Sequence, residues 1–148
     1  MLEYMSKIQV NKLHTLTGHN DCIYALREGG DPRYFYTGAG DGMVVEWDLD
    51  HPKDGVLLAR LPHSVYALEV DSKRNTLIVG HNYEGIHVID LAEKKESWNL
   101  KLSTAAIFDL KVFGEELFVA TGDGLLVVVD LEARAIKRYI KLSSKSIR

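Results

Sequence analysis

The chain repeats itself at intervals of about 40 residues, and this periodicity constrains its fold more than any other feature. Residues 23–26 (IYAL) match residues 65–68 (VYAL), and these match residues 107–110 (IFDL). Two independent markers in register indicate a repeat architecture. The second marker, a residue followed by Asp-Leu, recurs at residues 47–49, 89–91 and 129–131.

Each repeat contains four short segments with the composition of β-strands. Polar or glycine-containing turns separate them, such as residues 40–42 (GDG) in the first repeat. Short apolar segments joined by tight turns are typical of antiparallel meanders, so the sequence predicts an all-β fold of four-stranded antiparallel sheets. The predicted strands are 22–28, 34–38, 43–48 and 56–61, then 65–70, 76–80, 86–90 and 98–102, then 107–112, 117–120, 125–130 and 136–142.

The first repeat resembles the WD-repeat β-propeller family. Residues 18–19 (Gly-His) precede its first strand, residues 40–42 form a turn, and residues 47–48 (Trp-Asp) close its third strand. The two later repeats keep the strand pattern, but neither has a Gly-His pair or a Trp before its Asp. The resemblance implies β-propeller blades, each a four-stranded antiparallel sheet.

The resemblance also implies that the chain forms only part of a propeller. Propellers usually have about four to eight blades, and the family suggests a ring of seven. The remaining blades of a longer protein, or a second copy of this chain, are then needed to close the ring. The expected layout is an unpaired N-terminal outer strand at 7–16, blade 1 at 22–61, blade 2 at 64–102, blade 3 at 106–142, and the start of a fourth blade at 146–148.

In WD-repeat proteins a hydrogen-bonded network within the blade joins four side chains. Carried over by position, they are His19, Thr37, Asp41 and Trp47. An imidazole can donate to a carboxylate and accept from a hydroxyl, and a buried indole N–H needs a partner. A structural network that fixes a turn is therefore favoured over a catalytic pair of His19 and Asp41.

The composition is that of a globular protein with no strong charge. The 148 residues are 46% hydrophobic, and the net charge is −3, which gives no reason to expect nucleic acid or an acidic membrane surface as partner. Cys22 is the single cysteine, so an intramolecular disulfide framework is excluded. No apolar run approaches the length that spans a membrane. We expect a cytoplasmic protein.

Residue patterns for catalysis or cofactor binding are not found. The six histidines show neither paired metal-ligand spacing nor cysteine companions, although His81 and His87 flank one loop. Residues 38–42 (GAGDG) are rich in glycine, but they join two strands and open no helix, so they do not predict a phosphate-binding loop. We expect no cofactor, no metal and no enzymatic activity.

A non-catalytic scaffold that binds proteins through propeller loops is the favoured function. Its expected contact residues are His63, His81, Asn82 and Tyr83. Blade 2 departs most from the pattern in the turn that contains Tyr83, and exposed aromatic residues anchor interfaces. The alternative is a propeller enzyme or small-molecule binder that uses the central channel of the completed ring. Its candidate channel residues lie on the innermost strands, namely Glu69, Asp109 and Lys111.

Overall fold

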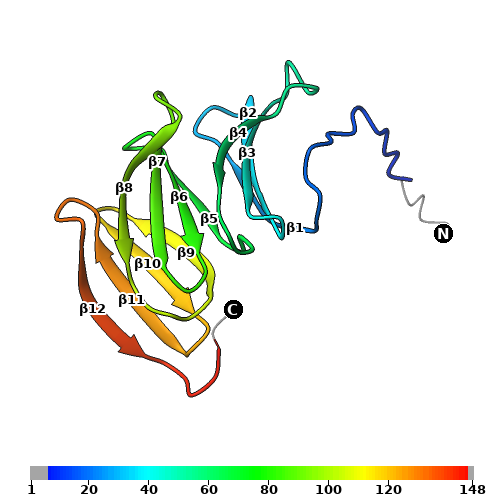
Figure 1. The fold of residues 1–148 in the computed structure, drawn as a ribbon. Coiled ribbons are helices and arrows are strands. Elements are labelled where there is room, and N and C mark those ends of the chain that lie inside the picture. The colour runs from blue at the N-terminus through cyan, green and yellow to red at the C-terminus, as the bar shows by residue number, and fades with distance from the viewer. Residues whose placement is uncertain (1–6, 147–148) are drawn as a thin grey trace, which may run out of the picture.

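The computed structural model describes residues 7–146, and these fold into three four-stranded antiparallel sheets without a helix (Figure 1). The predicted all-β fold is confirmed. The first sheet contains β1 (Ile23–Glu28), β2 (Tyr34–Ala39), β3 (Met43–Asp48) and β4 (Val56–Arg60). The second contains β5 (Leu68–Asp71), β6 (Thr76–His81), β7 (Gly85–Asp90) and β8 (Lys95–Lys101). The third contains β9 (Ile107–Phe113), β10 (Glu116–Thr121), β11 (Leu125–Asp130) and β12 (Ala135–Lys141).

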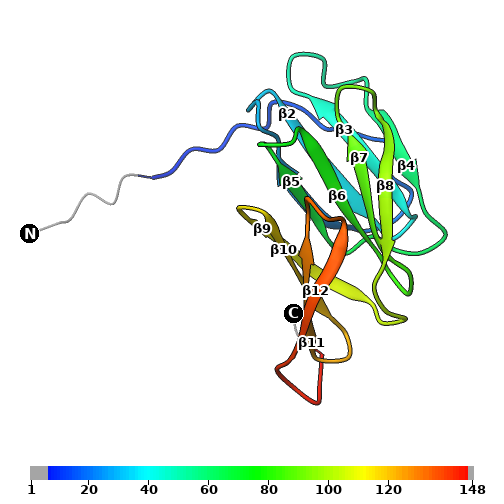
Figure 2. The ribbon, with the colours of Figure 1, turned by 90° about the vertical axis from the view of Figure 1, so that its left-hand side faces the viewer.

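The three sheets follow one another around an arc, with the second sheet in the middle (Figures 1 and 2). Within each sheet the strands pair in the order in which they occur in the sequence. The first strands β1, β5 and β9 contact each other in turn, so they form the inner side of the arc. The outer strands β4, β8 and β12 pair only with the strand before them.

The second sheet is packed on both faces, and the alternation along β6 shows why. Leu77 and Val79 point to the first sheet and are fully buried there with Val44. Ile78 points to the opposite face and is buried with Val119 of the third sheet. Successive side chains of a strand point to opposite faces, so an apolar run such as residues 77–79 serves both interfaces. Each such side chain stabilises the fold by about 1.5–3 kcal/mol.

The outer faces of the first and third sheets expose large apolar side chains. Leu26 and Leu57 of the first sheet are 59% and 51% exposed. Phe113 of the third sheet is 63% exposed. No sheet formed by the described residues covers these two faces, which distinguishes them from the two faces of the second sheet.

The predicted outer strand at residues 7–16 stays a prediction, because its expected partners belong to the last blade of a closed ring. This stretch forms no strand, and Ile8, Val10 and Leu13 are 82–89% exposed. A strand needs a hydrogen-bonding partner, and the free edges at β4 and β12 take none from this segment, as expected of a strand that is unpaired within these three sheets. The predicted start of a fourth blade comprises residues 146–148. Ser146 lies in no strand, and residues 147–148 lie outside the described part of the chain. Residues 1–6 also lie outside it.

The first strand of the second sheet begins three residues later than predicted. The stretch from Val65 to Ala67 bridges two sheets instead of pairing along one. The Val65 N–H donates to Ala39 O of the first sheet, and Ala67 O accepts from Gly80 N of the second. Regular pairing therefore starts only at Leu68.

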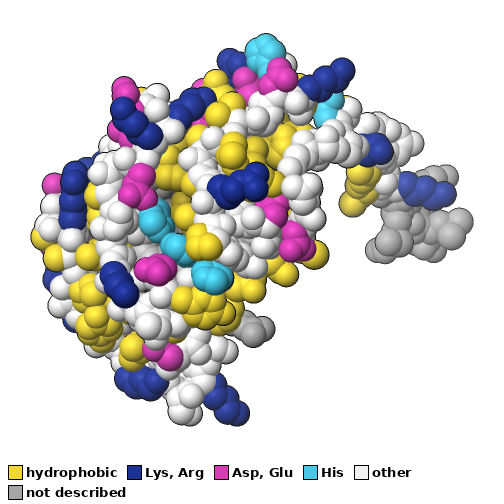
Figure 3. Space-filling model, in the orientation of Figure 1, with side chains coloured by type: hydrophobic (Ala, Val, Ile, Leu, Met, Phe, Trp, Pro, Cys, Tyr) yellow, Lys and Arg dark blue, Asp and Glu magenta, His cyan; other side chains and the backbone are white. Residues whose placement is uncertain are grey.

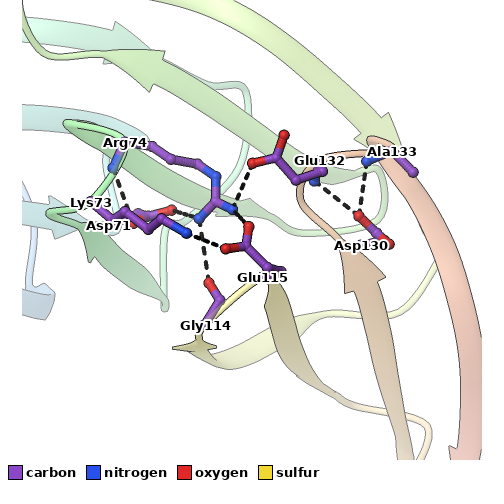
Figure 4. A network of polar contacts seen from close by, with 8 residues as sticks. All are labelled: Asp71, Lys73, Arg74, Gly114, Glu115, Asp130, Glu132 and Ala133. Atoms are coloured by element: carbon purple, nitrogen blue, oxygen red, sulfur yellow. Dashed lines mark hydrogen bonds and ion pairs between the residues drawn. The ribbon is translucent and has the colours of Figure 1, made fainter.

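A cluster of charged side chains joins the second and third sheets at the end opposite the β6–β7 turn (Figure 4). Arg74, in the β5–β6 turn, contacts Asp71 Oδ2 at 2.8 Å and Glu132 Oε1 at 3.1 Å, and it also pairs with Glu115. Its side chain is 19% exposed and that of Asp71 only 3%. A guanidinium has five donors in a fixed fork, which lets one side chain bind acceptors from several turns. This junction is therefore filled by Arg74.

Candidate functional site

The four residues of the predicted network lie together in the first sheet. His19 Nε2 is 2.7 Å from Thr37 Oγ1, and the Trp47 Nε1–H donates to the same hydroxyl oxygen at 2.8 Å. His19 Nδ1 lies 3.2 Å from Asp41 Oδ2. The carboxylate must accept from Nδ1–H, so Nε2 accepts from the Thr37 hydroxyl, whose oxygen accepts from the indole.

The polar groups of this network bind one another. The His19 side chain is 4% exposed, both of its ring nitrogens are engaged, and Trp47 is 3% exposed. Burial tends to raise the pKa of Asp41, but backbone N–H donors from Asn20 and Met43 and the ring of His19 outweigh it and hold the pKa below its usual 3.8. Gly18 lies against the indole, where an added Cβ would be 3.3 Å from Cη2. The arrangement fixes a turn.

The four expected contact residues divide into two exposed and two buried side chains. Tyr83 is 53% exposed and His63 is also exposed, and their rings meet edge to face with centroids 5.2 Å apart. His81 and Asn82, in contrast, are only 7% and 2% exposed. His81 and Asn82 therefore offer little side-chain surface, and the contact predicted for these four residues rests on His63 and Tyr83.

Asn82 is buried because it connects neighbouring sheets. Its Nδ2 donates to Ser64 O at 2.7 Å, and its Oδ1 accepts from Ile107 N at 2.9 Å. Ser64 precedes the crossing into the second sheet, and Ile107 starts the third. The next residue is fixed as well, because Tyr83 N donates to Ala105 O at 3.1 Å. The loop is thus rigid at its base and exposed at Tyr83.

His81 ends a chain of polar side chains at the rim of the second sheet. His81 Nδ1 lies 2.9 Å from His87 Nε2, and His87 Nδ1 bonds to Glu96. Because the carboxylate accepts from His87 Nδ1–H, His87 Nε2 must accept from His81 Nδ1–H. His81 Nε2 is buried and has no hydrogen-bond partner among the described residues. Histidine and acidic side chains lie next to each other on the face seen in Figure 3.

The environment keeps His81 neutral. Burial is the main cause that lowers its pKa below the usual 6.5, and His87 and His63 add to it while Glu84 opposes them. Residues 81–87 show the two histidines in the sequence, but their contact depends on the turn between β6 and β7, and Glu96 comes from β8. Sequence reasoning therefore missed Glu96, although a Glu on an alternating strand next to polar His87 is a detectable pattern.

The candidate channel residues lie on the inner strands and pair with charges on other inner strands. Asp109 Oδ1 is 3.2 Å from Arg27 Nη2, and Glu69 Oε1 is 3.6 Å from Lys111 Nζ. Glu69 is 7% exposed, and burial is the main cause that raises its pKa above 4.5. An aromatic row crosses the same strands, in which Tyr66 lies between Tyr24 and Phe108 with centroid distances of 4.8 and 5.7 Å.

Comparison with solved structures identifies the fold. The structure of U3-55K matches with a TM-score of 0.78 at 14% sequence identity, over 88% of this chain and 42% of that one. The crystal structure of RRP9 WD40 repeats matches with a TM-score of 0.77, also at 14% identity and over the same shares of the two chains. The fold is that of WD40 propeller blades. This chain spans less than half of the length of these solved chains.

Sequence comparison adds no relative. No protein-family model matches the chain, and no curated protein matches it. Within residues 7–146, no group of three or more His, Cys, Asp or Glu side chains is placed to hold a metal ion. The described part of the chain also has no helix that is long and apolar enough to cross a membrane.

Replacing Thr37 by Val should destabilise the first sheet. The change keeps the shape but removes the hydroxyl, so His19 Nε2 and the buried Trp47 N–H both lose their partner, at about 1–3 kcal/mol of unfolding free energy. Thr76→Val is the matched control, because Thr76 also lies in a second strand. Urea unfolding followed by tryptophan fluorescence measures both. Equal effects of the two changes would contradict a structural role of the network.

Lowering the pH should destabilise the protein through His81. Its folded-state pKa lies below the unfolded value of 6.5, so the unfolded chain binds the proton first. The contribution is fully present above pH 6.5 and is lost as the pH falls below it, by up to about 1.4 kcal/mol per pH unit. Urea unfolding between pH 7.5 and 5.5 should show a smaller loss for His81→Gln and an unchanged loss for the exposed His14→Gln. Parallel curves for wild type and His81→Gln would contradict the assignment.

Proposed function

We propose that this chain is part of a non-catalytic scaffold that binds protein partners through the loops at the β6–β7 end of its sheets. The observation that supports it is the half-exposed ring of Tyr83, carried by a turn in which His81 and Asn82 are buried and the neighbouring Glu84 is exposed. WD40 propeller domains, whose fold this chain shares, commonly act as interaction scaffolds. A likeness of fold alone does not specify a partner.

The backbone at Tyr83 adds to this argument. Tyr83 has a φ of 70°, a left-handed conformation that is uncommon for a residue with a large side chain. Such strained conformations persist where the surrounding structure fixes them, and they cluster at functional sites. A tyrosine held in place loses little conformational entropy when it binds, so it is well suited to anchor an interface.

We further propose that the outer faces of the first and third sheets are covered in the working protein by the remaining blades of a ring or by a second copy. The exposed side chains of Leu26 and Phe113 support this, because large apolar patches on a surface mark interfaces. The match to less than half of two propeller chains supports further blades.

The composition supports the proposed location and class of partner. The single cysteine supports a cytoplasmic location. The net charge of −3 supports partners other than nucleic acid or membranes.

Site-specific crosslinking in cells tests the proposed loop. A photoreactive phenylalanine at position 83 should form adducts with a discrete set of other proteins. The control places it at Tyr139, which is 52% exposed compared with 53% for Tyr83. With a partner identified, Tyr83→Ala should weaken binding at least about tenfold, as is usual for an aromatic anchor. No adduct at position 83, or the same adducts at both positions, would contradict the proposal.

A further inference from the structure

A cavity of about 440 Å³ lies between the first and second sheets, at the end opposite Tyr83. Tyr36 and Glu46 line it and are themselves 4% and 6% exposed. Asp31, in the β1–β2 turn, and Ser72, in the β5–β6 turn, also line it and are exposed. The volume is within the range of small-molecule sites, which is about 300–1,000 Å³.

The corresponding junction between the second and third sheets holds the charged cluster around Arg74. In the first sheet, the arginine of the β1–β2 turn does not reach the next sheet. Arg33 is bound within its own sheet, with Nε 2.7 Å from Asp48 Oδ1. The cavity between the first and second sheets thus lies at the position that the Arg74 guanidinium fills between the second and third sheets. Carboxylates line this cavity, as they surround the Arg74 guanidinium.

The charges in the cavity do not balance. Glu46 Oε1 lies 2.7 Å from Lys94 Nζ, which reaches across from the β7–β8 turn of the second sheet. Asp31 adds a second carboxylate to the lining, which thus carries two carboxylates and one ammonium group, whereas the nearby Arg33 guanidinium is paired with Asp48 and Asp50. The Glu46 side chain is 7% exposed and that of Lys94 is 44% exposed. A buried carboxylate is stable only with partners, and its two oxygens accept about four hydrogen bonds.

Aromatic rings complete the lining. Tyr34 and Tyr36 are two residues apart on β2, so both point to the cavity side of the sheet. Burial is the main cause that raises the pKa of Tyr36, and the Glu46 carboxylate adds to it, so the phenol keeps its proton. The Tyr34 ring already has one cation over it, with Arg33 Cζ 5.2 Å from the ring centroid. Aromatic rings near carboxylates attract organic cations.

We propose that this cavity binds an organic cation, an alkylammonium or guanidinium group, with Glu46 and Asp31 as acceptors and Tyr34 and Tyr36 as aromatic walls. Lys94 shows that the Glu46 carboxylate accepts an ammonium group. One further cation neutralises the excess negative charge. The same chemistry can come from a small amine or from a Lys or Arg side chain of a polypeptide. The cavity lies at the opposite end of the sheets from Tyr83, so the proposal is independent of the proposed function.

Titration of the 148-residue chain with three probes tests this inference. The probes are n-butylammonium, its neutral analogue 1-butanol, and a capped Gly-Lys-Gly peptide, followed by the NMR signals of the Gly30 and Asn75 amides, which line the cavity. At least one cation should saturate with a dissociation constant below about 10 mM, at least about tenfold tighter than 1-butanol. Tighter binding of the peptide would indicate a partner side chain, and tighter binding of the free amine a small molecule.

Two variants and a control locate the binding. Asp31→Asn keeps the exposed turn and its acceptor oxygen but removes one charge, so it should weaken cation binding about five- to tenfold. Ser72→Phe should block the cavity. Glu116→Gln removes a carboxylate paired with Lys137 on the third sheet and should leave binding unchanged. Saturation by no cation, equal binding of 1-butanol, or the same affinity in both cavity variants and the control would overturn the inference.

Discussion

The structure depends on one constraint, which is that a sheet with two apolar faces needs a neighbour on each face. The second sheet meets it fully, since Leu77 and Val79 pack on the first sheet while Ile78 and Val88 pack on the third. The first and third sheets meet it on one face each. The arc of sheets and the exposed outer faces follow from this stacking.

Polar side chains fill the places where the stacked sheets diverge at their ends. At the β6–β7 end they form the chain from Glu96 through His87 to His81, and they hold the loop that carries Tyr83. At the other end, Arg74 closes one junction, whereas the other keeps a cavity around Glu46. The proposed binding surface and the proposed cation site thus lie at opposite ends of the same stacked sheets.

The strands were predictable because their determinants are local. Alternation, tight turns and a repeat of about 40 residues place each strand to within a few residues, and the spacing of Gly-His, Asp and Trp places the first-sheet network. The burial of Asn82 was not predictable in this way. It depends on Ser64 O and Ile107 N, which only the stacking of three sheets brings to the same loop.

Two further features lay beyond local patterns. The segment at residues 7–16 alternates like a strand, but the edge with which it would pair is not among the described strands, so its pairing stays a prediction. The contact of Lys94 with Glu46 joins residues of different repeats, so no spacing within a repeat reveals it. Contacts between repeats decide both the buried polar groups and the cavity, and these are what a pattern within one repeat leaves undetermined.

Native-state amide hydrogen exchange tests the central claim most directly, because it measures the free energy of opening strand by strand. If stability comes from covering both faces of a sheet, the amides of β6 and β7 exchange most slowly. The amides of β4 and β12, at the outer edges of the first and third sheets, then exchange fastest among the strands. Equal protection of all three sheets, or slower exchange in β12 than in β6, would contradict the account.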